Sequence, residues 1–382
     1  MTDEELIALA QEMVRTPSPT YEEGPLAELL VRQLSGQMDE VWVDDVGNVL
    51  GILDGTAPGP TVLFNGHMDH VDPGEMTEPY SGALLDGSRF GVAGQVIYGR
   101  AAMDMKGALA AMVGAINDLR RTGFAGRLLF TAVVQEEPAV GYGARAAVRH
   151  LLARGERPAV AIVGEATNGN VYLGHRGRLE FELTTFGRTA HASNPDRGVN
   201  AVYLMAEVIR ALPALPLPEH PVAGRCSYAV TRISCSPGRL SVVPDRCDIT
   251  LDVRYLPGES PERPEADLQA ILSRLEREIP QFRAELRRTK NMPPFLTPPE
   301  HPAARLLKAV AEEAAGRPVS FGTWRFGTDG TFIANEFGIT TLGYGPGDER
   351  FAHTPEEHLP VDQLLVARRV YAEFVRRAQQ VL

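Results

Sequence analysis

The amino-acid sequence predicts an α/β protein with a mixed, mainly parallel sheet flanked by helices, interrupted by an inserted domain of another kind. Three observations carry this prediction. Strand-like and helix-like segments alternate over the first part of the chain, their order changes near Gly177, and the first pattern resumes after a proline-rich stretch at 291–302. Such alternation is typical of parallel sheets, and a chain of 382 residues is long enough for two cores.

The first domain is predicted to be discontinuous, with residues 1–176 and 291–382 building one core. Its expected strands are 41–53, 61–64, 127–134, 159–163 and 340–343. Its expected helices are 25–34, 107–122, 144–154, 303–315 and 361–382. Open sheets of this kind collect their chemistry at the carboxyl ends of the strands, so functional residues are expected directly after these strands.

The inserted domain is expected to cover residues 177–290. Its predicted strands are 179–185, 227–234, 248–255 and 282–288, and its predicted helices are 200–212 and 266–278. The resulting order, β-α-β-β-α-β, is that of the ferredoxin-like unit.

Composition excludes several classes of partner. The formal net charge of −11 argues against nucleic acid and against an anionic membrane surface, because both require a basic patch. No apolar stretch approaches the roughly 20 residues that span a bilayer, and the acidic start of the chain suits a helix rather than a signal peptide. Cys226, Cys235 and Cys247 suit neither a disulfide framework nor a thiolate zinc site. We therefore expect a soluble, cytoplasmic protein.

A histidine and an aspartate follow the apolar run at 61–64. His67 and Asp69 lie two residues apart in the segment NGHMD, so their side chains leave a strand on the same side. The histidine can then bind a metal ion while the aspartate holds its other ring nitrogen. A polar strand end that makes only surface hydrogen bonds is the alternative for this motif alone.

Further carboxylates occupy equivalent places along the chain. Asp104 precedes the helix expected at 107–122, where it could cap that helix or use its two oxygens to bridge two metal ions. Glu136 and Glu137 close the strand at 127–134. Because adjacent residues at a strand end point to opposite sides, one can bind a metal ion while the other reaches a bound water; solvated surface charge is the alternative.

Two more candidates complete the set. Glu165 ends the strand at 159–163, and His353 follows the turn at 343–347. Two histidines and three carboxylates at the strand ends of one sheet form a ligand set that suits Zn²⁺ or a similar divalent ion. Taken together, His67, Asp104, Glu137, Glu165 and His353 predict a metal centre, although each alone is more often structural.

Seven segments resemble, in order, the motifs of the co-catalytic zinc deacylases and exopeptidases. They are GHMD, GRAAMDMKG, QEEP, GEAT, TAHASNPDRGVNA, VVPDRCDITLDVR and AHTPEEH, and they span nearly the whole chain. The family includes acetylornithine deacetylase, succinyl-diaminopimelate desuccinylase, aminoacylase and glutamate carboxypeptidase.

The resemblance implies two Zn²⁺ ions per subunit, which Co²⁺ or Mn²⁺ can replace. It assigns His67, Asp104 and Glu165 to one ion, and Asp104, Glu137 and His353 to the other. It also implies that Asp69 orients His67 and that Glu136 is the general acid and base. These roles are expectations carried over from the matching motifs.

The resemblance further implies that residues 177–290 form a lid and dimerisation domain. The histidine that matches His191 would reach the active site of the other subunit of a homodimer and stabilise the oxyanion. Arg176 and Arg254 match positions that face substrate carboxylates, with surface charge as the alternative. The loop FGTDG, which contains Gly327 and Thr328, resembles a segment that lines the substrate pocket.

Three positions depart from the best-known relatives. Pro138 follows the acidic pair where many relatives have a third glutamate, and Ser241 stands where many have an asparagine. Trp324 and Arg325, before the glycine loop, resemble a less characterised bacterial branch of dipeptidases or deacetylases. Substrate contacts are therefore expected to differ from those of the desuccinylases.

The expected activity is hydrolysis of an amide bond in a small N-acyl amino acid, with a dipeptidase or carboxypeptidase activity as the alternative. Two other classes compete with it. Residues 141–146 resemble a dinucleotide-binding turn with Glu165 placed 19 residues on, but the adjacent Glu136 and Glu137 would repel a pyrophosphate. A non-catalytic metal-binding protein is the second competitor, although such proteins usually lose a ligand or the base.

Overall fold

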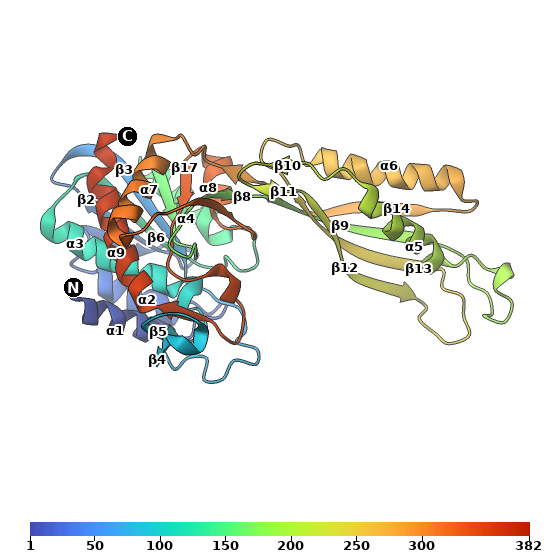
Figure 1. The fold of residues 1–382 in the computed structure, drawn as a ribbon, viewed down its shortest axis with the longest axis horizontal. Coiled ribbons are helices and arrows are strands. Elements are labelled where there is room, and N and C mark those ends of the chain that lie inside the picture. Colours follow the sequence, from blue (N-terminus) through green and yellow to red (C-terminus); the bar gives the residue numbers. More distant parts are fainter. The chain divides into compact units, whose positions relative to one another are not determined.

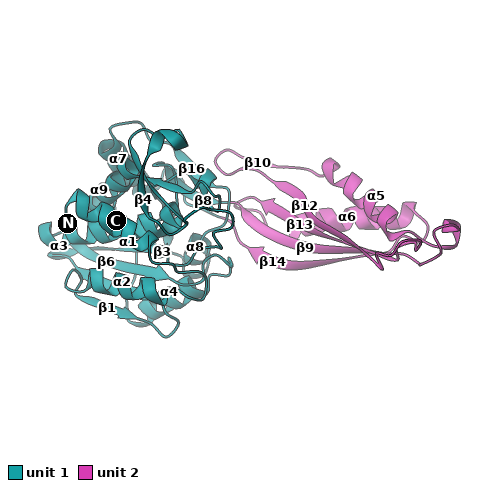
Figure 2. Ribbon diagram, turned by 90° about the horizontal axis from the view of Figure 1, so that it is seen from below, with its two compact units in different colours: residues 1–175, 295–382 teal, residues 176–294 magenta.

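The computed structural model describes all residues, 1–382, and divides them into two compact units. Unit 1 comprises Met1–His175 and Phe295–Leu382, and unit 2 comprises Arg176–Pro294 (Figure 2). These boundaries lie one residue and four residues from those expected from the sequence. Arg176 therefore belongs to unit 2 rather than to the first domain.

Unit 1 is built on a nine-stranded sheet in the order β1-β2-β6-β3-β7-β17-β8-β15, with β16 paired to β8. Its strands are β1 (Glu40–Val43), β2 (Val49–Asp54), β3 (Ala57–His67), β6 (Ala125–Val133), β7 (Val160–Val163), β8 (Val171–His175), β15 (Phe295–Leu296), β16 (Phe321–Trp324) and β17 (Thr340–Gly343). The four central strands, β6, β3, β7 and β17, run parallel, whereas β1 and β2 at one edge pair antiparallel. The structure confirms an α/β fold with a sheet that is parallel at its centre.

The single strand expected at 41–53 is wrong, because the structure has the hairpin β1–β2 there. Asp44 accepts hydrogen bonds from the backbone N–H groups of Val46 and Asn48, and Gly47 has a φ of +100°. A side chain that binds the backbone two residues on, together with a glycine in a left-handed conformation, is typical of a tight turn.

Helices cover both faces of this sheet. They are α1 (Asp3–Val14), α2 (Gly24–Leu34), α3 (Gly107–Thr122), α4 (Tyr142–Ala153), α7 (Pro302–Ala315), α8 (Gly330–Phe337) and α9 (Val361–Arg377). In Figures 1 and 2, α1, α3, α7 and α9 lie on one face, and α2, α4 and α8 on the other. Central strand residues such as Leu63, Phe64, Leu129 and Phe130 are fully buried, as expected for a sheet that is covered on both sides.

A smaller sheet in unit 1 has the order β18-β5-β4, from β4 (Ala83–Asp86), β5 (Gln95–Tyr98) and β18 (His358–Pro360). Strand β5 directly precedes the segment that contains Asp104, and β18 directly follows the segment that contains His353. The antiparallel pairing of β5 with β18, with Tyr98 opposite His358, keeps these two segments side by side.

Unit 2 has the element order β-α-β-β-α-β. It consists of β9 (Gly177–Phe186), α5 (Ala201–Ala211), β12 (Ser227–Ser236), β13 (Arg246–Tyr255), α6 (Glu262–Glu278) and β14 (Ala284–Met292), with a small hairpin, β10 (Glu219–His220) and β11 (Gly224–Arg225). The sheet order is β12-β13-β9-β14, with every pair antiparallel. Its core joins sheet residues such as Phe181 and Leu251 to helix residues such as Met205 and Leu272.

No helix in the structure is long and apolar enough to cross a bilayer.

Candidate metal centre

The four parallel strands at the centre of unit 1 place their carboxyl ends side by side. His67 is the last residue of β3, and Glu136 and Glu137 follow the end of β6. Glu165 follows β7, and the segment with His353 follows β17. The strand order β6-β3-β7-β17 thus gathers residues that are up to 286 positions apart in the chain (353 − 67).

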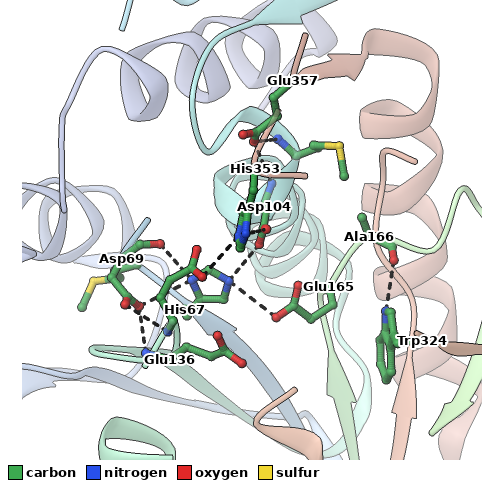
Figure 3. A network of polar contacts seen from close by, with 12 residues as sticks. His67, Asp69, Asp104, Glu136, Glu165, Ala166, Trp324, His353 and Glu357 are labelled. Carbon is green, nitrogen blue, oxygen red and sulfur yellow. Dashed lines mark hydrogen bonds and ion pairs between the residues drawn. The ribbon is translucent and has the colours of Figure 1, made fainter. Parts of the chain in front are cut away.

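His67 contacts two of the predicted ligands. Its ring is 2 % exposed, and its Nε2 lies 3.1 Å from Oδ1 of Asp104 and 3.5 Å from Oε1 of Glu165 (Figure 3). The same nitrogen therefore points into a space that is bordered by two carboxylates.

Asp104 contacts a histidine with each of its oxygens. Its Oδ2 lies 3.2 Å from Nε2 of His353, and that nitrogen lies 3.2 Å from Oε2 of Glu137. Asp104 does not cap the following helix, because it lies inside a turn with non-helical φ and ψ, and α3 begins at Gly107 without a side-chain cap. The structure therefore places the Asp104 carboxylate between two groups of predicted ligands.

The electrostatics of the centre favour a bound cation. Burial opposes charge on His67, but the carboxylates of Asp104, Asp69 and Glu165 near its ring raise its pKa well above the usual value. Hydrogen bonds to Asp104 and Glu137 raise the pKa of His353 to about 10. Burial, together with neighbouring carboxylates, raises the pKa of Glu165 well above its usual range. In the absence of a metal ion, protons must supply the positive charge that these carboxylates require.

The donor set fits divalent metal ions. Single donor atoms of His67, Asp104 and Glu137 lie within 4.8 Å of one another, as do those of His67, Glu136 and Glu165. Oε1 of Glu137 is buried without a hydrogen-bond partner, and a buried carboxylate oxygen is costly unless a cation or a donor satisfies it. Imidazole nitrogen and carboxylate oxygen are ligands that zinc commonly takes.

The turn at 135–137 is held by two carboxylates. The backbone N–H groups of Glu136 and Glu137 donate to Oδ1 and Oδ2 of Asp69 at 3.0 and 3.2 Å, and that of Gln135 donates to Oε1 of Glu23 at 3.0 Å. Asp69 also accepts from the hydroxyl of Thr20 at 2.9 Å. This arrangement fixes the backbone from which the Glu136 side chain extends.

Asp69 contacts His67 differently from the expectation. Nδ1 of His67 hydrogen-bonds to the backbone oxygen of Asp69 at 2.9 Å, whereas the nearest carboxylate oxygen of Asp69 is 3.5 Å away. The tautomer of His67 is therefore set mainly by a backbone carbonyl, because a 3.5 Å contact is at the limit of a hydrogen bond. The carboxylate of Asp69 mainly serves the turn at 135–137.

Three of the predicted residues belong to unit 2. His191 is exposed, and its Nδ1 lies 2.6 Å from the Ser193 hydroxyl and accepts the Ser193 backbone N–H at 3.2 Å. Arg176 donates to the backbone oxygen of Arg225 at 2.5 Å. Arg254 donates to Oδ1 of Asp252 at 2.6 Å.

Part of the FGTDG loop of unit 1, residues 326–330, makes structural contacts within the unit. Thr328 is fully buried; its backbone N–H donates to Nε2 of His175 at 3.1 Å, and its hydroxyl accepts from the backbone N–H of Gly330 at 3.2 Å. Gly327, directly before it, is partly exposed. The Trp324 side chain is buried and donates to the backbone oxygen of Ala166 at 3.0 Å (Figure 3), so it supports the segment that carries Glu165.

Sequence reasoning missed several residues of this region. Asp329 is 2 % exposed, and neither of its carboxylate oxygens has a hydrogen-bond partner. Burial raises the pKa of Glu136 well above its usual range, and the charge of Asp329 raises it further. Asp329 belongs to the FGTDG loop, so that motif gave a signal for it. Thr20 and Glu23 lie in another segment, and no sequence spacing relates them to Glu136.

The fold and this ligand set define a metal-dependent hydrolase class. The chain belongs to the peptidase family M20/M25/M40, whose family model matches residues 63–377. This match confirms the resemblance drawn from the motifs, and a hydrolase that acts on amide bonds is the activity that the family indicates.

Particular relatives extend the comparison. The succinyl-diaminopimelate desuccinylase of Methylorubrum extorquens is 30% identical over 380 residues, which cover 92% of this chain and 95% of that protein. The uncharacterised protein YgeY of Escherichia coli is 28% identical over 383 residues, with 95% and 91% covered.

Solved structures share the fold. Aminopeptidase PepT of Bacillus cereus has a TM-score of 0.80 at 23% identity, with 98% of each chain covered. The YxeP protein of Bacillus subtilis, described as a dinuclear metal-binding peptidase of the M20 family, has a TM-score of 0.77 at 16% identity, with 100% of this chain and 99% of that chain covered.

Proposed function

We propose that this protein is a two-zinc hydrolase that cleaves the amide bond of a small N-acyl amino acid. His67, Asp104 and Glu165 would hold one ion, and Asp104, Glu137 and His353 the other. The observation that carries this proposal is the position of Asp104, whose two oxygens lie 3.1 and 3.2 Å from two different histidines. A carboxylate placed in this way can serve two ions at once.

When bound, the two ions would supply Lewis acidity, which activates a water and polarises the amide carbonyl. Glu136 would take the proton from the attacking water and return it to the leaving nitrogen, giving a carboxylate and an amine. Its backbone is held by Asp69, and its side chain is buried beside the ligands. A buried carboxylate binds a proton more readily than an exposed one, which suits a group that must accept and release one.

His191 would stabilise the oxyanion from a second copy of the chain, in a homodimer that forms through the inserted domain at 177–290. The Ser193 backbone N–H donates to Nδ1 of His191, so the neutral ring carries its proton on Nε2. That nitrogen is then a donor, and an oxyanion donor typically contributes about 10²–10³ in rate.

Arg176, Arg254, Gly327 and Thr328 are proposed substrate contacts. The two arginines would bind a substrate carboxylate, for which the guanidinium geometry is well suited. Arg254 already pairs with Asp252, so a substrate carboxylate would have to compete with that pair. The three cysteines form no disulfide, which suits a reducing cytoplasm.

A substrate screen tests this proposal. Metal-free protein is reconstituted with Zn²⁺, Co²⁺ or Mn²⁺, and release of amine is measured with a panel of N-acyl amino acids and dipeptides. Hydrolysis of N-acyl amino acids supports the deacylase proposal, and hydrolysis of dipeptides alone would replace it with a dipeptidase that uses the same centre. Protein that binds two ions but cleaves neither class would overturn the proposed function.

A further inference from the structure

Glu357 is a buried carboxylate that the proposed mechanism does not use. It lies four residues after His353 and is fully buried. Its Oε2 accepts from Nη1 of Arg100 at 2.5 Å, and its Oε1 accepts from the backbone N–H groups of Met103 and Asp104 at 3.3 Å each. Figure 3 shows Glu357 next to His353 and Asp104.

These contacts join two segments that each supply a predicted ligand. Asp104 lies in the turn Ala102–Lys106, and His353 lies in the loop before β18. Glu357 belongs to the His353 segment, but its side chain binds the backbone of the Asp104 segment. The backbone N–H of Gly99 also donates to the backbone oxygen of Glu357, at 3.4 Å. The carboxylate therefore links the segments where they pass each other.

The Glu357 carboxylate pairs with a buried cation, the guanidinium of Arg100. The Arg100 side chain is 2 % exposed, and its Nη2 donates to the backbone oxygen of Pro73 at 3.3 Å. Removing the Glu357 charge leaves the Arg100 guanidinium without the carboxylate that it pairs with, and an uncompensated buried charge is strongly destabilising.

We propose that Glu357 is a positioning residue that holds Asp104 and His353 at the separation they need to share one metal ion. This inference rests on the proposed two-metal function. Of the two proposed ions, only the one bound by Asp104, Glu137 and His353 depends on both linked segments. Loss of the Glu357 carboxylate should therefore weaken the binding of that ion and affect the binding of the ion at His67 and Glu165 much less.

The test compares Glu357→Gln with Glu356→Gln, the exposed neighbour, in the full-length protein. Metal-free samples are titrated with Co²⁺ and followed by calorimetry and by visible absorption. His67→Ala and His353→Ala serve as references that identify each ion. We expect Glu357→Gln to lower the affinity for one Co²⁺ ion by about 10–100-fold, as is usual when a partner of a metal ligand is lost. Its absorption spectrum should match that of His353→Ala. Glu356→Gln should bind both ions normally.

Each outcome decides the proposal. Normal binding of both ions by folded Glu357→Gln, or equal weakening of both, would overturn it. If Glu357→Gln does not fold, Arg100→Lys decides in the same way, because a lysine keeps the charge but loses the guanidinium fork that contacts both Glu357 and the backbone oxygen of Pro73. Wild-type protein that binds fewer than two Co²⁺ ions would instead show that the proposed function itself is wrong.

Discussion

Oδ1 of Asp69 accepts the backbone N–H of Glu136 at 3.0 Å, so the residue expected to orient a metal ligand also holds the proposed general base. Its Oδ2 accepts the next N–H, that of Glu137, at 3.2 Å. One side chain thereby places a predicted base and a predicted ligand. Substitutions at Asp69 and at Glu136 should therefore both lower turnover more than they lower metal binding.

Asp69→Asn should lower turnover more than it lowers metal content. The two N–H groups donate to different oxygens of Asp69; in asparagine an NH₂ group replaces one of these oxygens, so in the same orientation one N–H group faces another donor. We expect kcat to fall by about 10–100-fold, because partners of a metal site typically have effects of this size. Kinetics together with metal analysis check this. A variant that loses its metal while metal-loaded molecules keep normal kcat would contradict it. Thr20→Val, which removes only the third contact of Asp69, is the milder control.

Glu136→Gln should remove turnover while both ions stay bound. Glutamine has nearly the shape of glutamate but cannot accept the proton from the attacking water, and general acid–base catalysis contributes about 10²–10⁴ in rate. Turnover and metal stoichiometry are measured on the same sample. Near-normal turnover with metal bound would show that another group is the base.

Mixing two inactive variants tests whether His191 acts across subunits. A dimer formed from His191→Ala and Glu136→Gln chains has one complete site, if His191 of one chain serves Glu136 of the other. After subunit exchange at equal concentrations, half of the dimers are mixed, so we expect about a quarter of wild-type activity. Mixtures that stay as inactive as the separate variants, with exchange confirmed by mass spectrometry, would place His191 outside the partner's active site.

That most of the candidate ligands lie close together could be predicted, because these residues follow apolar strands. His67, Glu137 and Glu165 follow runs of buried residues, and in a parallel sheet such positions must meet at one edge. His353 follows a turn after β17 and could be placed by the same rule. The inserted unit was recognisable from the change of period near Gly177.

What could not be predicted depends on contacts between distant segments. Glu23 and Glu357 accept hydrogen bonds from the backbone of other segments, 112 and 253 positions away, and Thr20 donates to the side chain of Asp69, 49 positions away. No local period or spacing encodes such a contact. Asp329 stood next to two predicted residues, but its isolation from hydrogen-bond donors is a property of the packed core.

The pH dependence of stability should depend on His70. This buried ring accepts the backbone N–H of Ser18 on Nε2 at 3.1 Å, and its Nδ1 lies 2.7 Å from the backbone oxygen of Val71. Burial, with the nearby charge of Lys106, lowers the pKa of His70 from 6.5 to about 4. Between pH 6.5 and 4 the unfolded chain therefore binds a proton that the folded chain does not, so stability falls as the pH is lowered through this window.

The His70→Gln variant isolates that contribution. It lacks the titrating ring, so its free energy of unfolding should fall less than that of the wild type between pH 6.5 and 4.5, by about 1–2 kcal/mol. Urea unfolding of metal-free protein at several pH values measures this difference, with exposed His150→Gln as the matched control. Parallel pH curves for His70→Gln and wild type would contradict the prediction. Because His70 holds Ser18, and Thr20 in the same segment binds Asp69, acid should also loosen the support of the Glu136 turn before the core unfolds.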